Sequence, residues 1–531
     1  MKKILICDGL AESGLDLLRT EPDICFDVPD QPGAEEITSM LPHYDAMIVR
    51  SRTTVTPAML AIPGDLKVIG RAGTGIDNID VGAATSKGIL VMNTPGANAM
   101  AAAEHTMALM LALARHIPQA TQSMREGRWE RKAFMGTELY HQTLGVIGIG
   151  KIGSLVAKRG LAMEMEVIAY DPFISPEAAA ALGINLVDLN TLLDRSDFVT
   201  LHTPLTSETR GLINHDTISR IKPGARIINC ARGGLIDEKA LYEALLNQHL
   251  AGAALDVFAQ EPPVKNPLLS LPNCIFTPHL GASSVQAQEN VGRLIASQII
   301  AFLKHGIIRN AVNFPSIAPK DYEQIQPYLN LAERLGSLQG QLCRGVERLE
   351  IEYSGVELSD MPLPALTQAA AKGLLDSTLT EGVNFVNAPI LLRERKIDLI
   401  VSSTSEPRGY TGLIQVTVHT KAGHSTAAGT VLPGEELRLV RLFDYHLETE
   451  LEGINLIIQN LDQPGTIGAI GTILGNARIN IADMHLSRTP ERDKAIAVIR
   501  LDSEAPLGAL QMLANHPAII FVEQVFLPDR G

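Results

Sequence analysis

The chain has 531 residues, of which 46% are hydrophobic and 20% charged, as in folded soluble proteins rather than disordered ones. At roughly 150 residues per domain, this length corresponds to about three or four domains. A net charge of −14 excludes a broad basic face for nucleic-acid phosphates, and a 4% share of aromatic residues argues against a base-stacking platform. A few clustered arginines can still attract a small anionic substrate.

Five cysteines are scattered along the chain without any CxxC pair: Cys7, Cys25, Cys230, Cys274 and Cys343. This spacing fits neither a disulfide framework nor a zinc site, so we expect reduced thiols and no metal. The N-terminal sequence reaches Asp8 too early for a signal peptide, and the most apolar stretch, 99–117, carries charged residues and falls short of a membrane span. These features predict a cytoplasmic protein with no nucleic-acid or membrane partner.

Two runs of alternating strands and helices predict two doubly wound parallel sheets, each covered by helices on both faces. The strands expected in the first run are 3–7, 24–28, 46–49, 66–69 and 89–91, with helices over 11–20 and 34–40. The strands expected in the second run are 144–147, 167–170, 198–201, 226–230, 252–257 and 274–277. A helix over 99–116, apolar nearly all round, is typical of a buried helix, and a helix over 284–304 can carry the chain back to the first unit.

The last part of the chain has a different pattern. Within 313–450 we expect strands 348–354 and 413–418 and a helix over 366–375, and this region contains no chemical motif. The final unit has strand 454–459, helix 466–476, strands 481–487 and 495–501, helix 507–515 and strand 518–525. This β-α-β-β-α-β order predicts a ferredoxin-like domain. Because it contains no nucleophile, base or metal cluster, we expect it to bind or sense a ligand.

A G-x-G-x-x-G motif at Gly148, Gly150 and Gly153 follows an expected strand and opens a helix. These glycines permit a tight turn, close approach of a pyrophosphate and close helix–strand packing, with the pyrophosphate at the helix N-terminus. Asp171, at the end of the next strand, is placed to hydrogen-bond both hydroxyls of an adenosine ribose. Because its carboxylate repels a 2′-phosphate and no arginine adjoins it, the motif predicts NAD rather than NADP.

Three chemically active side chains come directly after strands of the second run: Arg232, Glu261 and His279. Ligands of open parallel sheets bind beyond the carboxyl ends of the strands, so these side chains can meet beside a nicotinamide. A histidine can take the hydroxyl proton of a secondary alcohol, and a carboxylate can fix its tautomer and raise its pKa. An arginine can bind the carboxylate of a 2-hydroxy acid bidentately. Each residue alone has a structural alternative, but together they predict a dehydrogenase site.

These motifs resemble the D-isomer-specific 2-hydroxyacid dehydrogenases, through the glycine motif with Asp171 and the segments 231–237, 256–263 and 278–282. Segments 71–78 and 129–137 resemble the branch of that family that acts on 3-phosphoglycerate. The resemblance covers essentially the whole chain and implies an α/β fold with two doubly wound parallel-sheet domains, an α+β intervening domain and a ferredoxin-like ACT domain. It implies a substrate-binding domain of 1–97 and 283–312, a Rossmann domain of 98–282, an intervening domain of 313–452 and an ACT domain of 453–531.

By the family pattern, His279 is the acid/base, Glu261 its partner and Arg232 the substrate arginine. The resemblance also implies cofactor contacts from Thr74, Lys151, Ile152, Thr203, Cys230 and Asp256. In the first unit, the expected strands place Arg50 and Arg71 at the cleft, where they can supply positive charge for a substrate phosphate. The amides of Gly73 and Thr74 can bind the substrate carboxylate.

Arg131 and Lys132 complete the pocket in the family pattern, from a neighbouring subunit, although Ala133 stands where relatives commonly have a lysine. A solvated surface cation is an equal alternative for Arg50, Arg131 and Lys132. The alternative has less weight for Arg71, because that residue lies in a glycine-flanked motif.

The segment 460–465 resembles the ligand loop of ACT domains. The resemblance implies that Asn460, Asp462 and Asn480 bind a serine effector between paired ACT domains. Alternatively, Asp462 caps the following helix and the domain only dimerises.

The resemblance as a whole implies NAD-dependent oxidation of D-3-phosphoglycerate to 3-phosphohydroxypyruvate, the first step of L-serine biosynthesis, by a homodimer or homotetramer. One alternative is another 2-hydroxy acid, such as glycerate or lactate. Another is an NAD-sensing binding protein like the C-terminal-binding-protein corepressors, which share this fold and catalytic trio. Those corepressors carry disordered tails, whereas the C-terminal part of this chain is patterned as a folded domain.

Overall fold

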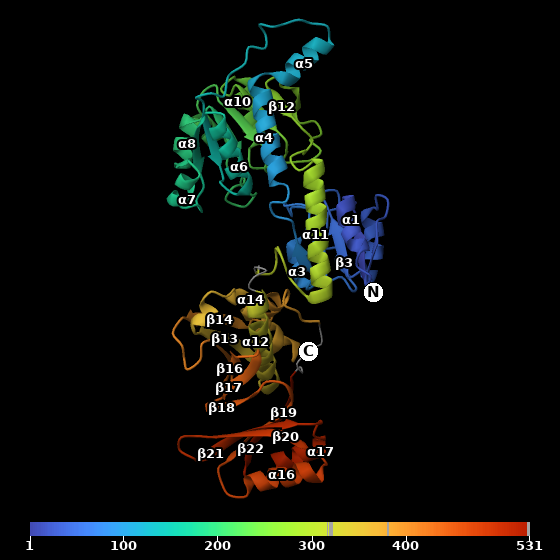
Figure 1. Cartoon of the computed structure of the whole chain (residues 1–531), viewed down its shortest axis with the longest axis vertical. Coiled ribbons are helices and arrows are strands. Elements are labelled where there is room, and N and C mark those ends of the chain that lie inside the picture. Colours follow the sequence, from blue (N-terminus) through green and yellow to red (C-terminus); the bar gives the residue numbers. More distant parts are fainter. Residues whose placement is uncertain (316, 318–321, 380–381, 528–531) are drawn as a thin grey trace.

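The computed structural model describes residues 1–315, 317, 322–379 and 382–527, and its four sheets follow one another along an elongated molecule (Figure 1). The seven-stranded sheet lies at one end, followed by a five-stranded, a six-stranded and a four-stranded sheet. This arrangement confirms the predicted fold class of two parallel α/β units followed by two further α+β units.

The five-stranded sheet is parallel and has the order β2-β1-β3-β4-β5. Its strands are β1 (Lys2–Ile6), β2 (Ile24–Asp27), β3 (Ala46–Val49), β4 (Val68–Arg71) and β5 (Leu90–Met92). Its helices are α1 (Glu12–Arg19), α2 (Ala34–Met40), the 3-10 helix η1 (Leu41–His43) and α3 (Val81–Ser86). The long helix α11 (Val285–His305) returns to this sheet, as predicted, and packs on α1 where Gly14 faces Gly292. A Cβ on Gly14 would lie 2.7 Å from the Gly292 carbonyl oxygen, so this close helix contact needs glycine.

The seven-stranded sheet is also parallel, with the order β12-β11-β10-β9-β6-β7-β8. Its strands are β6 (Thr143–Ile147), β7 (Glu166–Tyr170), β8 (Asn185–Leu186), β9 (Phe198–Leu201), β10 (Arg226–Asn229), β11 (Gly252–Leu255) and β12 (Cys274–Phe276). Its helices are α6 (Lys151–Ala162), α7 (Pro176–Ala181), α8 (Leu189–Arg195), α9 (His215–Arg220), α10 (Glu238–Leu246) and the 3-10 helix η2 (Pro267–Ser270). The six predicted strands are present, and the two-residue edge strand β8 is an addition that is too short to leave a hydrophobic pattern.

The expected helix over 99–116 is two helices, α4 (Ala99–Ala114) and α5 (Ile117–Arg125). His116 between them has a φ of 52°, and Pro118 stands in the first turn of α5, so the chain changes direction here. Helix α4 is buried on much of its surface against the seven-stranded sheet, as its composition predicts.

The six-stranded sheet has the order β14-β13-β15-β16-β17-β18, and only the β13–β14 pair is parallel. Its strands are β13 (Val346–Ser354), β14 (Asp398–Thr404), β15 (Leu413–Thr420), β16 (Gly423–Leu432), β17 (Glu436–Leu442) and β18 (Tyr445–Glu450). Its helices are α12 (Tyr322–Leu342), α13 (Val356–Ser359), α14 (Leu363–Asp376) and α15 (Ala388–Glu394). Only β13, β15 and α14 were predicted, because the other strands mix polar and apolar residues and α12 carries Pro327 in its interior.

The four-stranded sheet is antiparallel, with the order β20-β21-β19-β22 and two helices, which confirms the predicted ferredoxin-like unit. Its strands are β19 (Gly453–Leu461), β20 (Ile481–Arg488), β21 (Lys494–Leu501) and β22 (Ile519–Leu527), and its helices are α16 (Thr466–Asn476) and α17 (Leu507–Ala514).

All five cysteines are free thiols, as predicted. The described residues include no group of three or more His, Cys, Asp or Glu side chains arranged to hold a metal. No helix within 1–315, 317, 322–379 and 382–527 has the length and hydropathy needed to cross a membrane.

Candidate active site

His279 and Glu261 form a hydrogen-bonded pair beyond the carboxyl ends of β11 and β12. The distance from His279 Nδ1 to Glu261 Oε2 is 2.7 Å, and Glu261 Oε1 accepts a hydrogen bond of 3.0 Å from the Phe258 amide. The His279 backbone has a φ of 55°, and its amide donates to the carbonyl oxygens of Asp256 and Thr277. A proton on Nδ1, donated to the carboxylate, leaves Nε2 free to accept a proton from a substrate.

The charge of the pair sets the acid–base properties of the histidine. The hydrogen bond to Glu261 raises the pKa of His279 above its ordinary value, and this effect outweighs burial, which lowers it. Burial raises the pKa of Glu261, but its hydrogen bonds with His279 and the Phe258 amide bring the net pKa below its ordinary value. Both shifts favour the imidazolium–carboxylate form, which is the state of the pair after the histidine has taken a proton.

Asp256 anchors the segment that carries His279. Its carboxylate is only 1% exposed and accepts hydrogen bonds from Thr277 Oγ1 at 2.6 Å and from the amides of Leu280 and Gly281. His105 Nε2, on α4, lies 3.2 Å from the same carboxylate. Burial raises the pKa of Asp256, but hydrogen bonds, the one with His105 first, hold the net pKa below its ordinary value. The sequence did not indicate this positioning role of Asp256 or any role for His105.

Arg232 reaches from the seven-stranded sheet to the five-stranded sheet. Its Nε donates to Asp77 Oδ2 at 2.8 Å, and its Nη1 donates to the Ala231 carbonyl. A Cβ on Gly75 would lie 2.1 Å from Arg232 Nη2, so the guanidinium packs closely against this loop. Asp77 follows β4, and sequence reasoning gave it no role of its own, although it lies within the 71–78 segment.

Arg71, the last residue of β4, approaches the same glycine-rich loop. A Cβ on Gly73 would lie 1.3 Å from Arg71 Nη1, and Arg71 Nε is buried without a hydrogen-bond partner. Burial, followed by the nearby positive charge of Arg232, lowers the pKa of Arg71 to about 10, which still leaves it charged at neutral pH. A buried guanidinium with an unpaired N–H is suited to bind an anion. Thr74 Oγ1 donates to Asn98 Oδ1 at 2.8 Å and thereby ties this loop to the start of α4.

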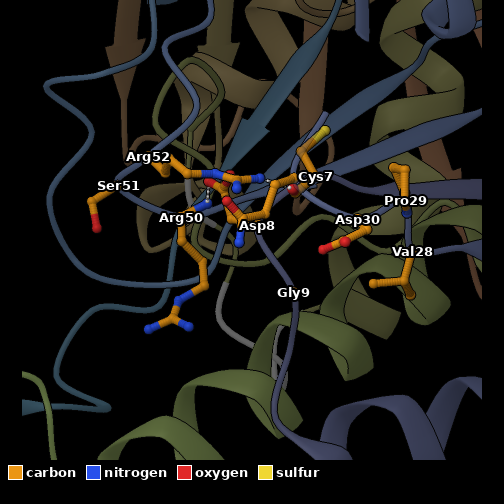
Figure 2. Close-up of a pocket in the computed structure, with 10 residues that line it drawn as sticks. Cys7, Asp8, Gly9, Val28, Pro29, Asp30, Arg50, Ser51 and Arg52 are labelled. Atoms are coloured by element: carbon orange, nitrogen blue, oxygen red, sulfur yellow. Dashed lines mark hydrogen bonds and ion pairs between the residues drawn. The ribbon is translucent and has the colours of Figure 1, made fainter. Parts of the chain in front are cut away.

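Arg50 lies at the end of β3 beside a cavity of about 510 Å³ (Figure 2). Its amide donates to Asp8 Oδ2 at 2.7 Å, and its guanidinium points away from Asp8 and donates to Gln288 of α11. Arg52, which sequence reasoning missed, lies beside Asp8 and donates from Nη2 to the Cys7 carbonyl at 2.8 Å. Alternating arginines in Arg50-Ser51-Arg52 are the sequence signal that could have indicated both.

The structure does not bring Arg131 and Lys132 to this cleft. Both side chains are exposed, and the segment that follows α5 lies at the far end of the molecule from the five-stranded sheet (Figure 1). Their place in the substrate pocket therefore requires a neighbouring subunit, as the family resemblance implied.

The glycine motif forms a cradle that fits a dinucleotide. Gly148 has a φ of 91°, and a Cβ on Gly153 would lie 2.0 Å from the Gly148 carbonyl oxygen, so both positions need glycine. A Cβ on Gly150 would meet nothing within 4 Å, which leaves open space in front of the N-terminus of α6. Gly150 is the N-cap of α6 and provides no side-chain cap, so the first amides of the helix are available to a pyrophosphate.

Four of the other predicted cofactor residues lie at or beside this cradle. Thr203 Oγ1 is buried without a partner, which suits a contact to a bound dinucleotide. Lys151 donates to the Pro95 carbonyl at 3.1 Å, and Ile152 is the next residue of α6. Asp171, beyond β7, accepts hydrogen bonds from the amides of Ile149 and Phe173. These two bonds fix the carboxylate beside the glycine motif.

Cys230, which follows β10, is buried, and burial raises the pKa of its thiol to about 12. This thiol is therefore protonated at neutral pH and is not a nucleophile. A contact between Cys230 and the cofactor stays a prediction.

A second cavity, of about 850 Å³, lies between the loop 460–465, the start of α16 and β20. Asn460 and Asp462 both line it; Asp462 is paired with Arg488 at 3.2 Å, and Asn460 Oδ1 is buried without a hydrogen-bond partner. The alternative in which Asp462 caps α16 is wrong, because the N-cap is Gly465 and no side chain caps the helix.

Asn480 lies outside this cavity. Its side-chain amide donates to Asp502 Oδ2 at 2.6 Å. The structure thus brings Asn460 and Asp462 together within one chain but not Asn480, which can join them only from a second copy of the chain.

The fold and this geometry define an NAD-dependent dehydrogenase of the D-isomer-specific 2-hydroxyacid class. Residues 107–281 match the NAD-binding domain of the D-isomer specific 2-hydroxyacid dehydrogenases, and residues 324–443 match the D-3-phosphoglycerate dehydrogenase intervening domain. The structure of D-lactate dehydrogenase from Aquifex aeolicus, complexed with NAD and lactic acid, superposes with a TM-score of 0.53 at 29% identity. It covers 59% of this chain and 100% of that one.

Relatives of nearly the same length show to which branch of these dehydrogenases the chain belongs. D-3-phosphoglycerate dehydrogenase from Synechocystis is 45% identical over 98% of this chain and 94% of the relative. The Bacillus subtilis protein of the same name is 39% identical over 99% of this chain and 100% of the relative. The chain belongs to the D-3-phosphoglycerate dehydrogenase family.

Proposed function

We propose that this protein oxidises D-3-phosphoglycerate to 3-phosphohydroxypyruvate with NAD, as the first step of L-serine biosynthesis. The observation that carries the proposal is the 2.7 Å His279–Glu261 pair at a cleft that also holds the guanidinium groups of Arg232 and Arg71. A base and two cations are what the oxidation of an anionic 2-hydroxy acid requires. The named relatives support the same substrate.

Each side chain of the site has a separate role in the reaction. His279 Nε2 accepts the proton of the C2 hydroxyl, and Glu261 stabilises the imidazolium that forms. When bound in the glycine cradle, NAD would supply the acceptor for the hydride at C2, so the substrate carbon would lose two electrons and its hydroxyl oxygen would become a carbonyl oxygen. Arg232 binds the substrate carboxylate and polarises the developing carbonyl. Because Asp77 holds Arg232 Nε, the substrate carboxylate must share the guanidinium with Asp77 or displace it.

Recognition of the phosphate is assigned to Arg50 and Arg71, with Arg131 and Lys132 supplied by a second subunit. The buried, unpaired Nε of Arg71 is the strongest support, since an anion there satisfies an otherwise unpaired donor. This arrangement favours phosphoglycerate over glycerate and lactate, which lack the second anionic group.

We also propose that serine binds in the cavity beside 460–465 and modulates the enzyme. The buried Asn460 Oδ1 can accept a hydrogen bond from the serine ammonium, and the uncapped amides of α16 can bind its carboxylate. Asn480 of a paired ACT domain completes the site, which requires at least a homodimer.

We assign substrate binding to 1–97 and 283–312, NAD binding to 98–282, an intervening domain to 313–452 and an ACT domain to 453–531. Location in the cytoplasm remains a prediction, as does the alternative of an NAD-sensing corepressor. Efficient turnover of a hydroxy acid would exclude the corepressor alternative.

The test replaces Arg71 with methionine, which keeps the length and apolar stem of the side chain but removes its charge. We expect kcat/KM for D-3-phosphoglycerate to fall about 100-fold, as for loss of a charged hydrogen bond of ~1.5–3 kcal/mol, and kcat/KM for D-glycerate to change much less. Lys67→Met, one residue before β4 and paired with Asp45, is the control and should leave both substrates unaffected. Equal losses for the two substrates would contradict the phosphate assignment.

A further inference from the structure

Strand β14, Asp398–Thr404, is an open edge of the six-stranded sheet. Its neighbour on one side is β13, and it lies at the left margin of this sheet in Figure 1. Three consecutive apolar side chains on it, Leu399, Ile400 and Val401, are 40%, 41% and 44% exposed. Because side chains alternate along a strand, both faces of this edge are apolar and open.

Such an edge is unusual for a folded protein. An unpaired strand edge presents free amides and carbonyls, and proteins normally protect it with charges, proline, a bulge or a covering element. None of these occurs within Asp398–Thr404 except the terminal Asp398. The opposite edge of the same sheet, β18, is in contact with β20 of the four-stranded sheet. One edge is therefore covered within the chain, and the other is left for a partner.

We propose that β14 pairs antiparallel with β14 of a second copy of this chain, about a two-fold axis that passes beside Val401. A two-fold axis perpendicular to the sheet keeps every side chain on its own face. Odd-numbered residues must therefore pair with odd-numbered residues, and even-numbered with even-numbered. Full overlap of the seven-residue strands then leaves one register, in which Val401 faces Val401, Ile400 faces Ser402 and Asp398 faces Thr404. The two six-stranded sheets become one continuous sheet.

The flanking charges fit an antiparallel pair. Lys396 precedes β14 in a turn with a φ of 57°, and Glu406 follows the strand, so the axis brings Lys396 of one copy to the end of the pair where Glu406 of the other copy lies. Both side chains are exposed, and neither forms an ion pair with another described residue of its own chain. At the other strand pair, the Thr404 hydroxyl can donate to the Asp398 carboxylate across the interface. A second copy therefore pairs the free backbone groups of β14, covers its apolar side chains and matches the charges at its ends.

The register is tested by cysteine cross-linking in the full-length protein. Val401→Cys places two thiols opposite each other at a Cα separation of about 4.5–5.5 Å, which suits a disulfide. We expect the oxidised variant to migrate as a dimer on a non-reducing gel, and the wild-type chain, with its own five thiols, to give the background. Ile400→Cys alone should not cross-link above that background, whereas Ile400→Cys with Ser402→Cys should. Absence of the Val401→Cys dimer, or equal cross-linking of Ile400→Cys, would overturn the proposal.

Whether the partner of β14 is a second copy of the chain is tested by the mass of the protein in solution. Val401→Lys places two like charges opposite each other across the axis, so we expect light scattering to give half the mass of the wild-type particle, which leaves the pairs that the C-terminal domains hold together. Ser405→Lys, which adds the same charge just beyond the strand, should keep the wild-type mass. NADH formation at the wild-type rate would show that Val401→Lys still folds. An unchanged mass for Val401→Lys, as expected if β14 binds a different protein, would contradict pairing between copies.

Discussion

The catalytic cleft and the cavity beside 460–465 differ in how far their polar groups are already paired. In the cleft, His279 is held by Glu261, Arg232 by Asp77, and the Asp256 carboxylate by four donors. In the cavity, Asn460 Oδ1 is buried without a partner, and the first turn of α16 has no side-chain cap. The first arrangement fits groups that are oriented before substrate binds, whereas the second leaves its hydrogen-bonding capacity for a ligand.

The largest effect is expected from removing the base of the cleft. His279→Ala should lower kcat for D-3-phosphoglycerate oxidation by about 10²–10⁴-fold, the usual contribution of a positioned general base. The binding of NAD, measured by calorimetry, should be unchanged, because the glycine cradle lies on other strands. Near-normal turnover in this variant would contradict the role of His279.

A smaller loss is expected from Glu261→Gln, together with a shift in pH dependence. Oxidation needs neutral His279, so the rate falls as pH decreases through the pKa of His279, which Glu261 raises. Removing the carboxylate lowers that pKa, and the acidic limb of the kcat/KM profile should move to lower pH while kcat decreases. Glu289→Gln, on the exposed surface of α11, should move neither quantity. If the acidic limb of the kcat/KM profile stays at the wild-type pH in Glu261→Gln, the role of Glu261 as the partner of His279 is contradicted.

The cavity is tested by Asn460→Ala. Loss of one hydrogen bond, worth about 1–1.5 kcal/mol, should weaken the response of the enzyme to serine by about tenfold. The turnover without serine should be unchanged, because the cavity lies on the four-stranded sheet. The same serine response in Asn460→Ala and wild type, measured by titrating serine into the NADH assay, would show that serine does not use this cavity.

The smallest effect is expected from Asp77→Asn, which keeps the shape of the side chain but removes its charge. The Asp77 side chain is 60% exposed, and such ion pairs contribute at most about 1 kcal/mol. Releasing Arg232 for the substrate should therefore lower KM by at most about fivefold, with kcat little changed. Asp65→Asn, another exposed acid, which lies just before β4, serves as the control. A raised KM would show that Asp77 orients Arg232 rather than competing for it.

Local spacing was sufficient to predict the parts of the fold and site that depend on strand ends. The glycine cradle and the loops carrying Arg232, Glu261 and His279 follow buried parallel strands, whose periodicity is visible in the sequence. The Arg232–Asp77 and His105–Asp256 contacts join residues 155 and 151 positions apart, and no local pattern encodes such pairs. The strands around β14 were missed because their polar and apolar residues do not alternate against a single core face.

The central claim is that the cleft oxidises a phosphorylated 2-hydroxy acid, and the most direct measurement compares substrates in the wild-type protein. NADH formation should be followed with NAD and either D-3-phosphoglycerate, D-glycerate or D-lactate. We predict a kcat/KM for D-3-phosphoglycerate at least about 100-fold above the other two, because only this substrate engages both arginine sites. Absence of NADH with D-3-phosphoglycerate, or equal turnover of D-glycerate, would contradict the account.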